Sequence, residues 1–425
     1  MNNTDNYNEE VRRHFKFNYT VNLLDVACYM FGVSFVSIGG VLLIYVTHFT
    51  QNPLLIGLIS VIATGGFLLP QLFTANMVER ASIKKFFPVN IGFFSERIPV
   101  FLLAPSAFLL ATRSPTLALF AFFLLFAWWN IGAGMVLVGW QDMVAKIIPV
   151  QSRGRFFGIS NFIGNVSGIL GAATVSWLLA KFVFPGGFVI SFIGASVFIF
   201  ISWIFLSLTR EPRDPMTKPV VSHLDYFKAL PKILRSNPNF QRYILTQIVS
   251  TFGAMAGGFL LVYAIERWTL SDGRAATYNI VLMVGQSAAN LFLGFLADRK
   301  GHKLVLEISI LLNISSFILA ILAPSPAWFY AIFALRGMNM AGNFISGLSL
   351  PLEFSEPQDR PTYIGLASTL PGIAGTIAPI LAGILAGTVG YPLLFAITTA
   401  IAIIAFGMMK WLVRDPRHLA EDSSV

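Results

Sequence analysis

Long apolar stretches, separated by short polar turns, run through almost the whole sequence. A helix that crosses a bilayer needs roughly 20 to 25 residues, and twelve stretches of about that length can be marked. They lie at about 20–46, 54–76, 86–111, 115–141, 156–180, 186–209, 241–265, 274–297, 304–323, 327–351, 362–386 and 390–413. The pattern predicts an all-α integral membrane protein with twelve transmembrane helices.

Three polar motifs of the first half recur in the second half. The corresponding pairs are ANMVERASIK at 75–84 with GFLADRKGHK at 294–303, SRGRFFG at 152–158 with DRPTYIG at 359–365, and LTREPR at 208–213 with LVRDPR at 412–417. Each pair occupies the same place among the predicted helices, and the order is the same in both halves. The repeat therefore predicts two pseudo-symmetric six-helix bundles, at 1–209 and at 241–425.

Residues 210–240 join the two predicted bundles. The segment is polar, contains five prolines, and includes HLDYFKALPKIL, in which apolar and polar positions follow helical spacing. We expect a cytoplasmic linker with a short amphipathic helix on the membrane surface. Lys228, Lys232 and Arg235 would then lie near lipid headgroups.

Composition supports a bilayer as the solvent of this chain. Hydrophobic residues make up 56% of the sequence and charged residues 12%, and the mean hydropathy is +0.72. So few charges could not cover the surface of a soluble protein. The first apolar stretch follows Arg12, Arg13 and Lys16 as in a signal peptide, but it is too long and lacks a convincing A-x-A site. We therefore expect a retained helix.

The basic residues are distributed unevenly along the chain. If both termini are cytoplasmic, most of the 29 Lys and Arg residues fall in the tails and cytoplasmic loops. The external loops then hold Arg113, Lys181, Arg267 and Arg274. This asymmetry follows the positive-inside rule, so the excess charge predicts contact with anionic lipid and not with nucleic acid. We expect a monomer that crosses the inner cell membrane several times, with cytoplasmic termini.

The loop FLGFLADRKGHK at 292–303 contains the pattern G-x-x-x-D-R-x-G-x-K between the eighth and ninth apolar stretches. Its residues are Gly294, Asp298, Arg299, Gly301 and Lys303. The first half holds a degraded copy with Glu79, Arg80 and Lys84, in which Ser82 replaces the second glycine. This motif, the duplicated topology and the central linker resemble the major facilitator superfamily over essentially the whole chain. No subfamily is indicated.

The resemblance implies that this loop is a conformational latch, mostly in an outward-facing state. Asp298 could accept hydrogen bonds from the amino end of the eleventh helix, where free N–H groups favour an anion, with Arg360 as a partner. The predicted latch residues are Gly294, Asp298, Arg299, Gly301, Lys303, Arg360, Glu79, Arg80 and Arg153. The alternative is a solvated turn whose basic residues only orient the protein.

Polar residues recur every three or four positions within several apolar stretches. Polar groups are costly in hydrocarbon and normally face the protein interior or water, and the resemblance implies that these helices line a central cavity. The substrate-cavity candidates are Asn22, Asp25, Tyr29, Asn130, Gln141, Asn161, Asn165, Asn279, Gln286, Asn290, Arg336, Asn339 and Asn343. The alternative is packing, in which Asn and Gln side chains bond between helices.

Charged residues inside the apolar stretches have more specific interpretations. Arg336 cannot shed its charge, so unless it is paired it would contact a substrate anion. Asp25 is the proton-coupling candidate, because a carboxylate partly removed from water can take up protons near neutral pH. Glu96, Arg97 and Glu307 are expected to form structural bridges.

The favoured function is a secondary transporter that moves a small solute by alternating access, with protons as a candidate coupling ion. The alternatives are a lipid flippase or membrane sensor of the same fold and, less favoured, an integral-membrane enzyme. No G-x-S-x-G, H-E-x-x-H or phosphate-loop motif is present, and such motifs carry the chemistry of common hydrolases. The single cysteine, Cys28, excludes an intrachain disulfide, and no metal or cofactor is expected.

Overall fold

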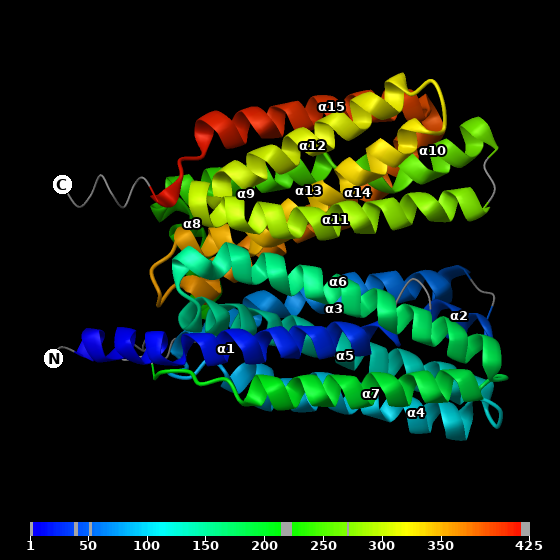
Figure 1. Ribbon diagram of the computed structural model, residues 1–425, viewed down its shortest axis with the longest axis horizontal. Coiled ribbons are helices and arrows are strands. Elements are labelled where there is room, and N and C mark those ends of the chain that lie inside the picture. The colour runs from blue at the N-terminus through cyan, green and yellow to red at the C-terminus, as the bar shows by residue number, and fades with distance from the viewer. Residues whose placement is uncertain (1–2, 38–40, 51–52, 214–222, 270–271, 418–425) are drawn as a thin grey trace. The chain divides into compact units, whose positions relative to one another are not determined.

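Every regular element in the described part of the chain is a helix (Figure 1). The computed structural model describes residues 3–37, 41–50, 53–213, 223–269 and 272–417. Within these ranges, ten helices or helix runs are long and apolar enough to cross a membrane. Helices α1 (Asn3–Ser34) and α13 (Trp328–Glu353) are also long, but they carry polar stripes. The predicted all-α membrane fold is confirmed, and these ten runs together with α1 and α13 agree with the predicted number of twelve.

The chain packs into two compact units. Unit 1 comprises Met1–Pro149 and Ile163–Val220, and unit 2 comprises Val150–Phe162 and Val221–Val425. The first part of one continuous helix, α6 (Val150–Lys181), therefore groups with unit 2. The two six-helix bundles that the sequence repeat predicted, at 1–209 and 241–425, have other boundaries than these units, and the division into bundles stays a prediction.

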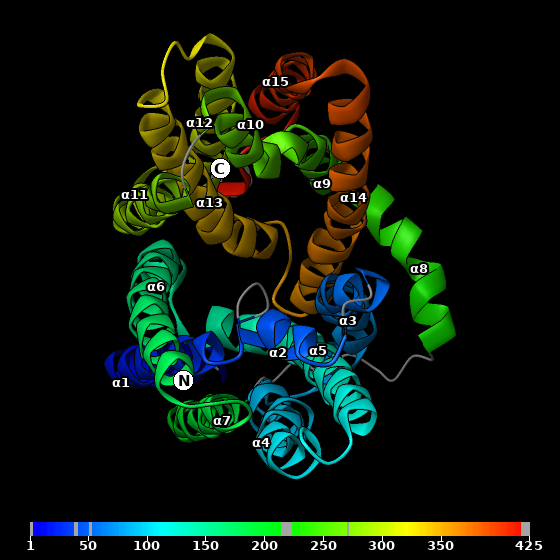
Figure 2. The same ribbon diagram turned by 90° about the vertical axis from the view of Figure 1, so that its right-hand side faces the viewer.

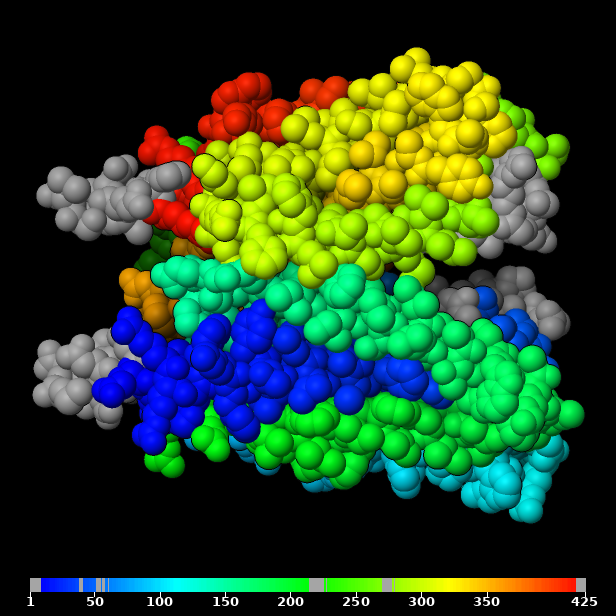
Figure 3. All heavy atoms as spheres, viewed as in Figure 1, coloured from blue at the N-terminus to red at the C-terminus, as the bar shows by residue number. Residues whose placement is uncertain are grey.

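Unit 1 contains long helices that pack in pairs. Besides α1 and the later part of α6, its elements are α2 (Leu43–Thr47), α3 (Pro53–Arg80), the π-helical turns η2 (Phe87–Ile91) and η3 (Phe93–Arg97), α4 (Ile98–Leu110), α5 (Pro115–Ile147) and α7 (Gly186–Ser207). Helix α1 lies along α7, and α3 lies along α5 (Figure 2). Figure 3 shows the surfaces of α1 and α7 side by side. Tyr45, Phe122, Phe126 and Phe192 form the centre of its core.

Unit 2 has the same kind of architecture. Besides α13 and the first part of α6, its elements are α8 (His223–Ser236), α9 (Pro238–Phe252), η4 (Met255–Gly258), α10 (Phe259–Trp268), α11 (Asp272–Lys300), α12 (His302–Leu322), α14 (Arg360–Val389), α15 (Tyr391–Gly407) and η5 (Met408–Leu412). Helix α13 packs between α11 and α12, and α14 packs along α9. Tyr278, Phe317, Phe329 and Phe395 lie in its core.

Helix α8 lies within the segment where sequence predicted a short amphipathic helix. Its inner face is held by the protein, since Tyr226 and Leu230 are buried and the hydroxyl of Tyr226 lies 2.9 Å from that of Thr362 in α14. The basic residues Lys228 and Lys232 are exposed. The apolar face of α8 therefore packs against the rest of unit 2.

Two glycines of α5 allow backbones to meet inside unit 1. A Cβ atom on Gly132 would lie 2.2 Å from the carbonyl oxygen of Ser95, and one on Gly134 would lie 2.3 Å from that of Phe67. Any larger residue would push η3 or α3 away from α5. Small residues have this role at close helix crossings in membranes.

We expect Gly132→Ala to lower the free energy of unfolding by about 1–3 kcal/mol, because the added methyl group overpacks the α5–η3 contact. Gly168→Ala is the matched control, since no atom lies within 4 Å of a Cβ placed there. The control should melt at the wild-type temperature or slightly above it, because alanine favours helix. Thermal unfolding of both purified variants measures the difference. Equal melting temperatures would contradict the close crossing.

Candidate functional site

The polar stripe of α1 is buried against the end of α7. The side-chain amide of Asn18 donates to the carbonyl of Arg210, and its oxygen accepts from the Arg210 N–H, both at 2.8 Å. Asn22 donates to the hydroxyl of Thr209 at 3.1 Å. These bonds lie within unit 1 and fit the packing alternative. A substrate-cavity role for Asn22 stays a prediction.

A buried group of charges follows on the same stripe. The carboxylate of Asp25, 5% exposed, accepts a 2.6 Å hydrogen bond from Ser202 of α7. Tyr29, one turn further along, donates to Oε1 of Glu96 at 3.3 Å. Glu96 forms a buried ion pair with Arg97, and both act electrostatically on Asp25. Two buried carboxylates, Asp25 and Glu96, thus lie near one guanidinium group, and only Glu96 is paired with it.

The expected Glu96–Arg97 bridge forms between neighbours on η3. Arg97 also donates to the carbonyl of Gly92 at 3.3 Å, and its Nε has no hydrogen-bond partner among the described residues. π-Helical turns such as η3 are frequent at functional sites. The group therefore combines an unusual backbone with an incompletely satisfied guanidinium group.

The candidates on α5 and α6 have different surroundings. Asn130 is buried and donates to the carbonyl of Phe126 on its own helix at 2.8 Å, and Gln141 is buried as well. Asn161 donates to Oδ1 of Asn290 on α11 at 2.7 Å. The side-chain nitrogens of Asn165 and Asn290 are buried without a hydrogen-bond partner in the described part of the chain.

The stripe on α13 faces α12 inside unit 2. Asn339 is buried and donates to the carbonyl of Ser309 at 2.8 Å, and Asn343 donates to the carbonyl of Asn339 at 3.0 Å. On α11, Gln286 is half-buried, whereas the side chain of Asn279 lies outside the described residues. The bonds of α13 again fit packing, and the cavity role of these residues stays a prediction.

Arg336 reaches the interruption between α9 and α10. Its guanidinium group donates to Asn313 on α12, lies 5.5 Å from the ring centre of Phe317, and would collide with a side chain at Gly257 in η4. Asn313 in turn donates to the carbonyl of Gly253 at 2.7 Å. Arg336 therefore supports the broken helix through a polar chain inside unit 2.

Asp298 binds the amino-terminal part of α6. Its carboxylate accepts hydrogen bonds from the backbone N–H groups of Gly154 and Arg155 at 2.7 and 2.9 Å, and from Nε of Arg155 at 3.0 Å. A Cβ atom on Gly158 would lie 2.3 Å from a carbonyl oxygen of α11, and one on Gly294 would lie 2.7 Å from a carbonyl oxygen of α6. The expectation of a helix amino end as partner holds, but the helix is α6 and not α14. Glycines on both sides let α6 approach α11 to backbone contact, and this brings its N–H groups to Asp298.

The remaining latch residues of the second half are not gathered at this carboxylate. Arg360 opens α14, and its Nε is buried without a hydrogen-bond partner in the described ranges. Lys303 lies 3.3 Å from Glu307, which also lies 3.3 Å from Lys410, and Arg299 is exposed. Gly301, with φ of 96°, is the one-residue turn between α11 and α12, where a left-handed backbone favours glycine.

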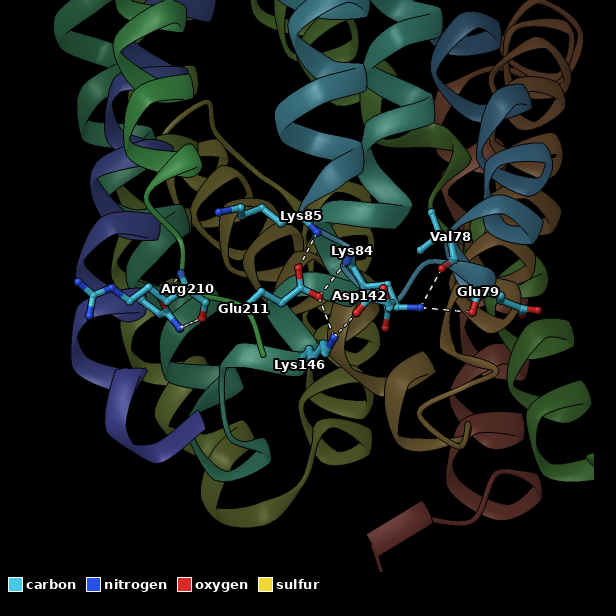
Figure 4. A network of polar contacts seen from close by, with 10 residues as sticks. Val78, Glu79, Lys84, Lys85, Asp142, Lys146, Arg210 and Glu211 are labelled. Atoms are coloured by element: carbon cyan, nitrogen blue, oxygen red, sulfur yellow. Dashed lines mark hydrogen bonds and ion pairs between the residues drawn. The ribbon is translucent and has the colours of Figure 1, made fainter. Parts of the chain in front are cut away.

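The first-half copy of the motif is organised by a residue that the sequence analysis did not assign. Glu211, in LTREPR, accepts hydrogen bonds from the backbone N–H groups of Lys84 and Lys85 at 2.8 and 2.7 Å. It also forms a 2.9 Å ion pair with Lys146 at the end of α5, with side chains 1% and 3% exposed. Figure 4 shows this carboxylate between the 84–85 backbone and the ammonium group. One carboxylate thus joins the 80–85 turn, α5 and the end of α7.

The lysines of this turn cap helix carboxyl ends. Lys84 donates to the carbonyl of Val78 at 2.8 Å and lies 3.5 Å from Asp142 (Figure 4). Lys85 donates to the carbonyls of Ser207 and Thr209 at 3.0 and 2.8 Å. Cations are favoured there because the last carbonyls of a helix lack partners. Burial lowers the pKa of the Lys85 ammonium group, and Glu211 opposes that shift.

The other predicted latch residues of the first half are placed as follows. Glu79 and Arg153 are buried, and Arg80 donates to Asn76 on its own helix. Arg153, at the start of α6, groups with unit 2. Their part in a latch stays a prediction.

Unit 2 has a network of its own, in which an acidic residue stands at the repeat position of Lys146. Glu353 stands as far before Arg360 as Lys146 stands before Arg153 in the repeat. Its carboxylate accepts two hydrogen bonds from Arg417 at 3.0 and 2.8 Å, and Arg417 also donates to the carbonyl of Asp298 at 3.1 Å. The repeated LTREPR and LVRDPR motifs were the sequence signal for these networks, because they contain Glu211 and Arg417.

Fold and site together define a multi-pass α-helical membrane protein whose helix ends are held by buried ion pairs. Residues 243–424 match the model of the Major Facilitator Superfamily. The fold resembles that of the E. coli fucose:proton symporter FucP, with a TM-score of 0.75, 16% identity, and coverage of 93% of this chain and 98% of that chain. The second half of the chain thus matches the superfamily that the loop motifs predicted. No subfamily is assigned.

Sequence relatives are more distant. The chain is 22% identical over 152 residues to the niacin transporter NiaP of Acinetobacter baylyi (strain ATCC 33305 / BD413 / ADP1), covering 36% of this chain and 35% of NiaP. It is 24% identical over 279 residues to YfkF, an uncharacterized MFS-type transporter of Bacillus subtilis (strain 168), covering 61% and 65%. The chain spans about a third of the length of the first of the curated relatives it matches.

We expect Glu211→Gln and Lys146→Met each to lower the free energy of unfolding by about 3–5 kcal/mol, because each leaves a buried charge without its partner. The double variant should lose less than the sum of the two, since neither charge then remains alone. Unfolding of the purified variants in mixed micelles measures these values. Arg113→Gln, on an exposed turn, is the control and should match wild type. Strictly additive losses would show that the pair does not interact.

Proposed function

We propose that the protein is a secondary transporter that moves a small solute across the membrane by alternating access. The observation that carries this proposal is the fold, which 93% of the chain shares with a protein named as a fucose:proton symporter. The buried charges of α1 and η3 and the α6–α11 contact add to it, because a transporter needs both a coupling group and a contact that can open. The membrane is proposed to be the inner cell membrane, with both termini in the cytoplasm and a monomeric protein.

Uptake into vesicles that contain the purified protein tests this function. A thermal-shift screen with sugars, amino acids, organic anions and lipophilic cations first selects the solute. The solute should then enter the vesicles chemically unchanged. A product that forms without solute movement would favour the enzyme alternative, and lipid scrambling without solute uptake would favour the flippase alternative.

Asp25 is proposed to couple transport to protons. It is buried together with Glu96, and Arg97 is the cation that acts on both. Burial of two carboxylates against one guanidinium group favours uptake of one proton, because an uncompensated charge is costly away from water. A proton that binds here would change the α1–α7 contact, where Ser202 donates to Asp25.

We expect Asp25→Asn to abolish accumulation of the solute that is driven by a pH gradient and to leave solute exchange without a gradient within about twofold of wild type. The amide can still accept from Ser202 but cannot take up a proton. Asp225→Asn, an exposed carboxylate on α8, is the matched control. Unchanged accumulation in the Asp25 variant would remove this residue from the coupling mechanism.

Asp298 is proposed to latch α6 onto α11 in one state of the transport cycle. Three hydrogen bonds hold the carboxylate of Asp298. The glycines beside it have no side chains that would interlock the two helices at this contact. Charge-assisted bonds of this kind are strong. A conformational change that separates the helices would break them together.

Asp298→Asn should raise the labelling rate of a cysteine at position 297 by about tenfold, because the lost charge weakens the hydrogen bonds that keep the contact closed. Ala297 is fully buried and would lie 3.0 Å from a Cβ atom on Gly154, so Ala297→Cys in a Cys28→Ser background reports separation of the helices. Lys300→Gln, an exposed neighbour, is the control. If the Asp298 and Lys300 variants are labelled at equal rates, Asp298 does not hold the contact closed and the loop is only a solvated turn.

A further inference from the structure

A pocket lies in unit 2, and none of the residues of the polar stripes lines it. It has a volume of about 550 Å³. It is lined mainly by the junction of α8 and α9, by the start of α14, and by Arg414, which lies two residues after the end of η5. The lining includes Asn237, Asn239, Arg242, Glu356, Asp359 and Arg414. Neither the latch nor the coupling group uses these residues.

The pocket lies at the membrane boundary of unit 2. Pro238 and Arg360 are the first residues of two membrane-spanning runs, and Leu412 is the last residue of a third. Pro238 itself lines the pocket, whereas Asp359 directly precedes Arg360. The ends of three candidate spans meet here, which favours a position of the pocket near the lipid headgroups.

Two guanidinium groups of the pocket are available for a ligand. Arg242 makes one long hydrogen bond, 3.5 Å, to the carbonyl of Leu412. Arg414 is held through its backbone, whose N–H donates to Asn239 at 2.8 Å and whose carbonyl accepts from Asn239 at 2.8 Å. Among the described residues, neither guanidinium group has an ion-pair partner in the structure. Arginine pairs of this kind suit a phosphate group.

The same pocket also carries negative charge. Glu356 and Asp359 line it, and Glu356 accepts a 2.9 Å hydrogen bond from Gln358. The Glu356 carboxylate would repel a ligand that carries only phosphate charge. A ligand with a phosphate group and an ammonium group matches both signs. The amino end of α9, capped by Asn237, adds a helix dipole that favours the phosphate.

An apolar surface adjoins the pocket. Trp411 is 79% exposed and Leu412 is 46% exposed. Only Val413 separates them from the pocket residue Arg414. Tryptophan is enriched at membrane interfaces, where its ring meets both headgroups and acyl chains. A ligand whose head occupies the pocket could therefore lay acyl chains along the end of α15 and η5.

We propose that this pocket binds the headgroup of a phospholipid that carries a primary amine, of the phosphatidylethanolamine type. Arg242 and Arg414 bind its phosphate, and Glu356 binds its ammonium group. The site would tie α8, α9, α14 and the end of η5 to the lipid surface. It is a lipid-binding site separate from the solute pathway.

Thermal shift of the purified protein with short-chain lipids tests this site. The dihexanoyl forms of phosphatidylethanolamine, phosphatidylglycerol and phosphatidylcholine are compared with free phosphoethanolamine. We expect phosphatidylethanolamine to give the largest rise in melting temperature. Equal rises with all three lipids, or none, would overturn the proposal. Free phosphoethanolamine acting at the same concentration as the lipid would overturn the lipid as the source of the headgroup.

Variants separate the two halves of the headgroup. Arg242→Gln with Arg414→Gln should weaken phosphatidylethanolamine binding by about tenfold or more, since both phosphate contacts are lost. Glu356→Gln should reduce the preference for phosphatidylethanolamine over phosphatidylglycerol without weakening phosphatidylglycerol binding. Lys232→Gln with Arg235→Gln removes the same charge from the exposed face of α8 and serves as the control. Melting without lipid confirms that each variant is folded, and equal binding by the arginine variant and the control would overturn the site.

Discussion

A polar group within a bilayer must find its partner inside the protein, because hydrocarbon offers none. This constraint explains why the stripe of α1 is turned toward α7, where Thr209 and Ser202 receive Asn22 and Asp25. It also explains why Arg336 extends to Asn313 beside the broken helix at η4. The polar residues of the apolar stretches thus build each unit from within. Those left incompletely paired, such as Arg97 and Asn290, are the ones with capacity for further chemistry.

The same constraint acts differently where the helices end. There the unpaired carbonyls and N–H groups of helix termini need charged partners. Glu211 and Lys146 supply them in unit 1, while Glu353 and Arg417 form an ion pair near the helix ends of unit 2. Asp298 belongs to this second network through its own carbonyl and to α6 through its carboxylate. The contact proposed as a latch is therefore joined to the helix-end network of unit 2 through the same residue.

The pocket beside α8 shows what remains when helix-end charges are not consumed inside the protein. Arg242 and Arg414 lie at helix ends of unit 2, and neither forms an ion pair with a carboxylate of the described residues. Their surroundings are polar, carry both signs of charge and adjoin exposed Trp411. The bilayer surface, with its own phosphates and amines, is the medium that can complete this site.

The sequence by itself determined the fold class, the approximate places of the apolar helices and the resemblance to a family, because hydrophobic length, the repeat and the G-x-x-x-D-R-x-G-x-K loop are local patterns that the bilayer and a tight turn impose directly. It also indicated that polar stripes exist on α1, α11 and α13. The tertiary structure decided what each stripe faces: α7 for Asp25, α12 for Asn339, and α6 instead of α14 for Asp298. A helical period states which residues share one side of a helix, but which neighbour covers that side depends on close approach at glycines such as Gly154 and Gly294, and such contacts join residues far apart in the chain.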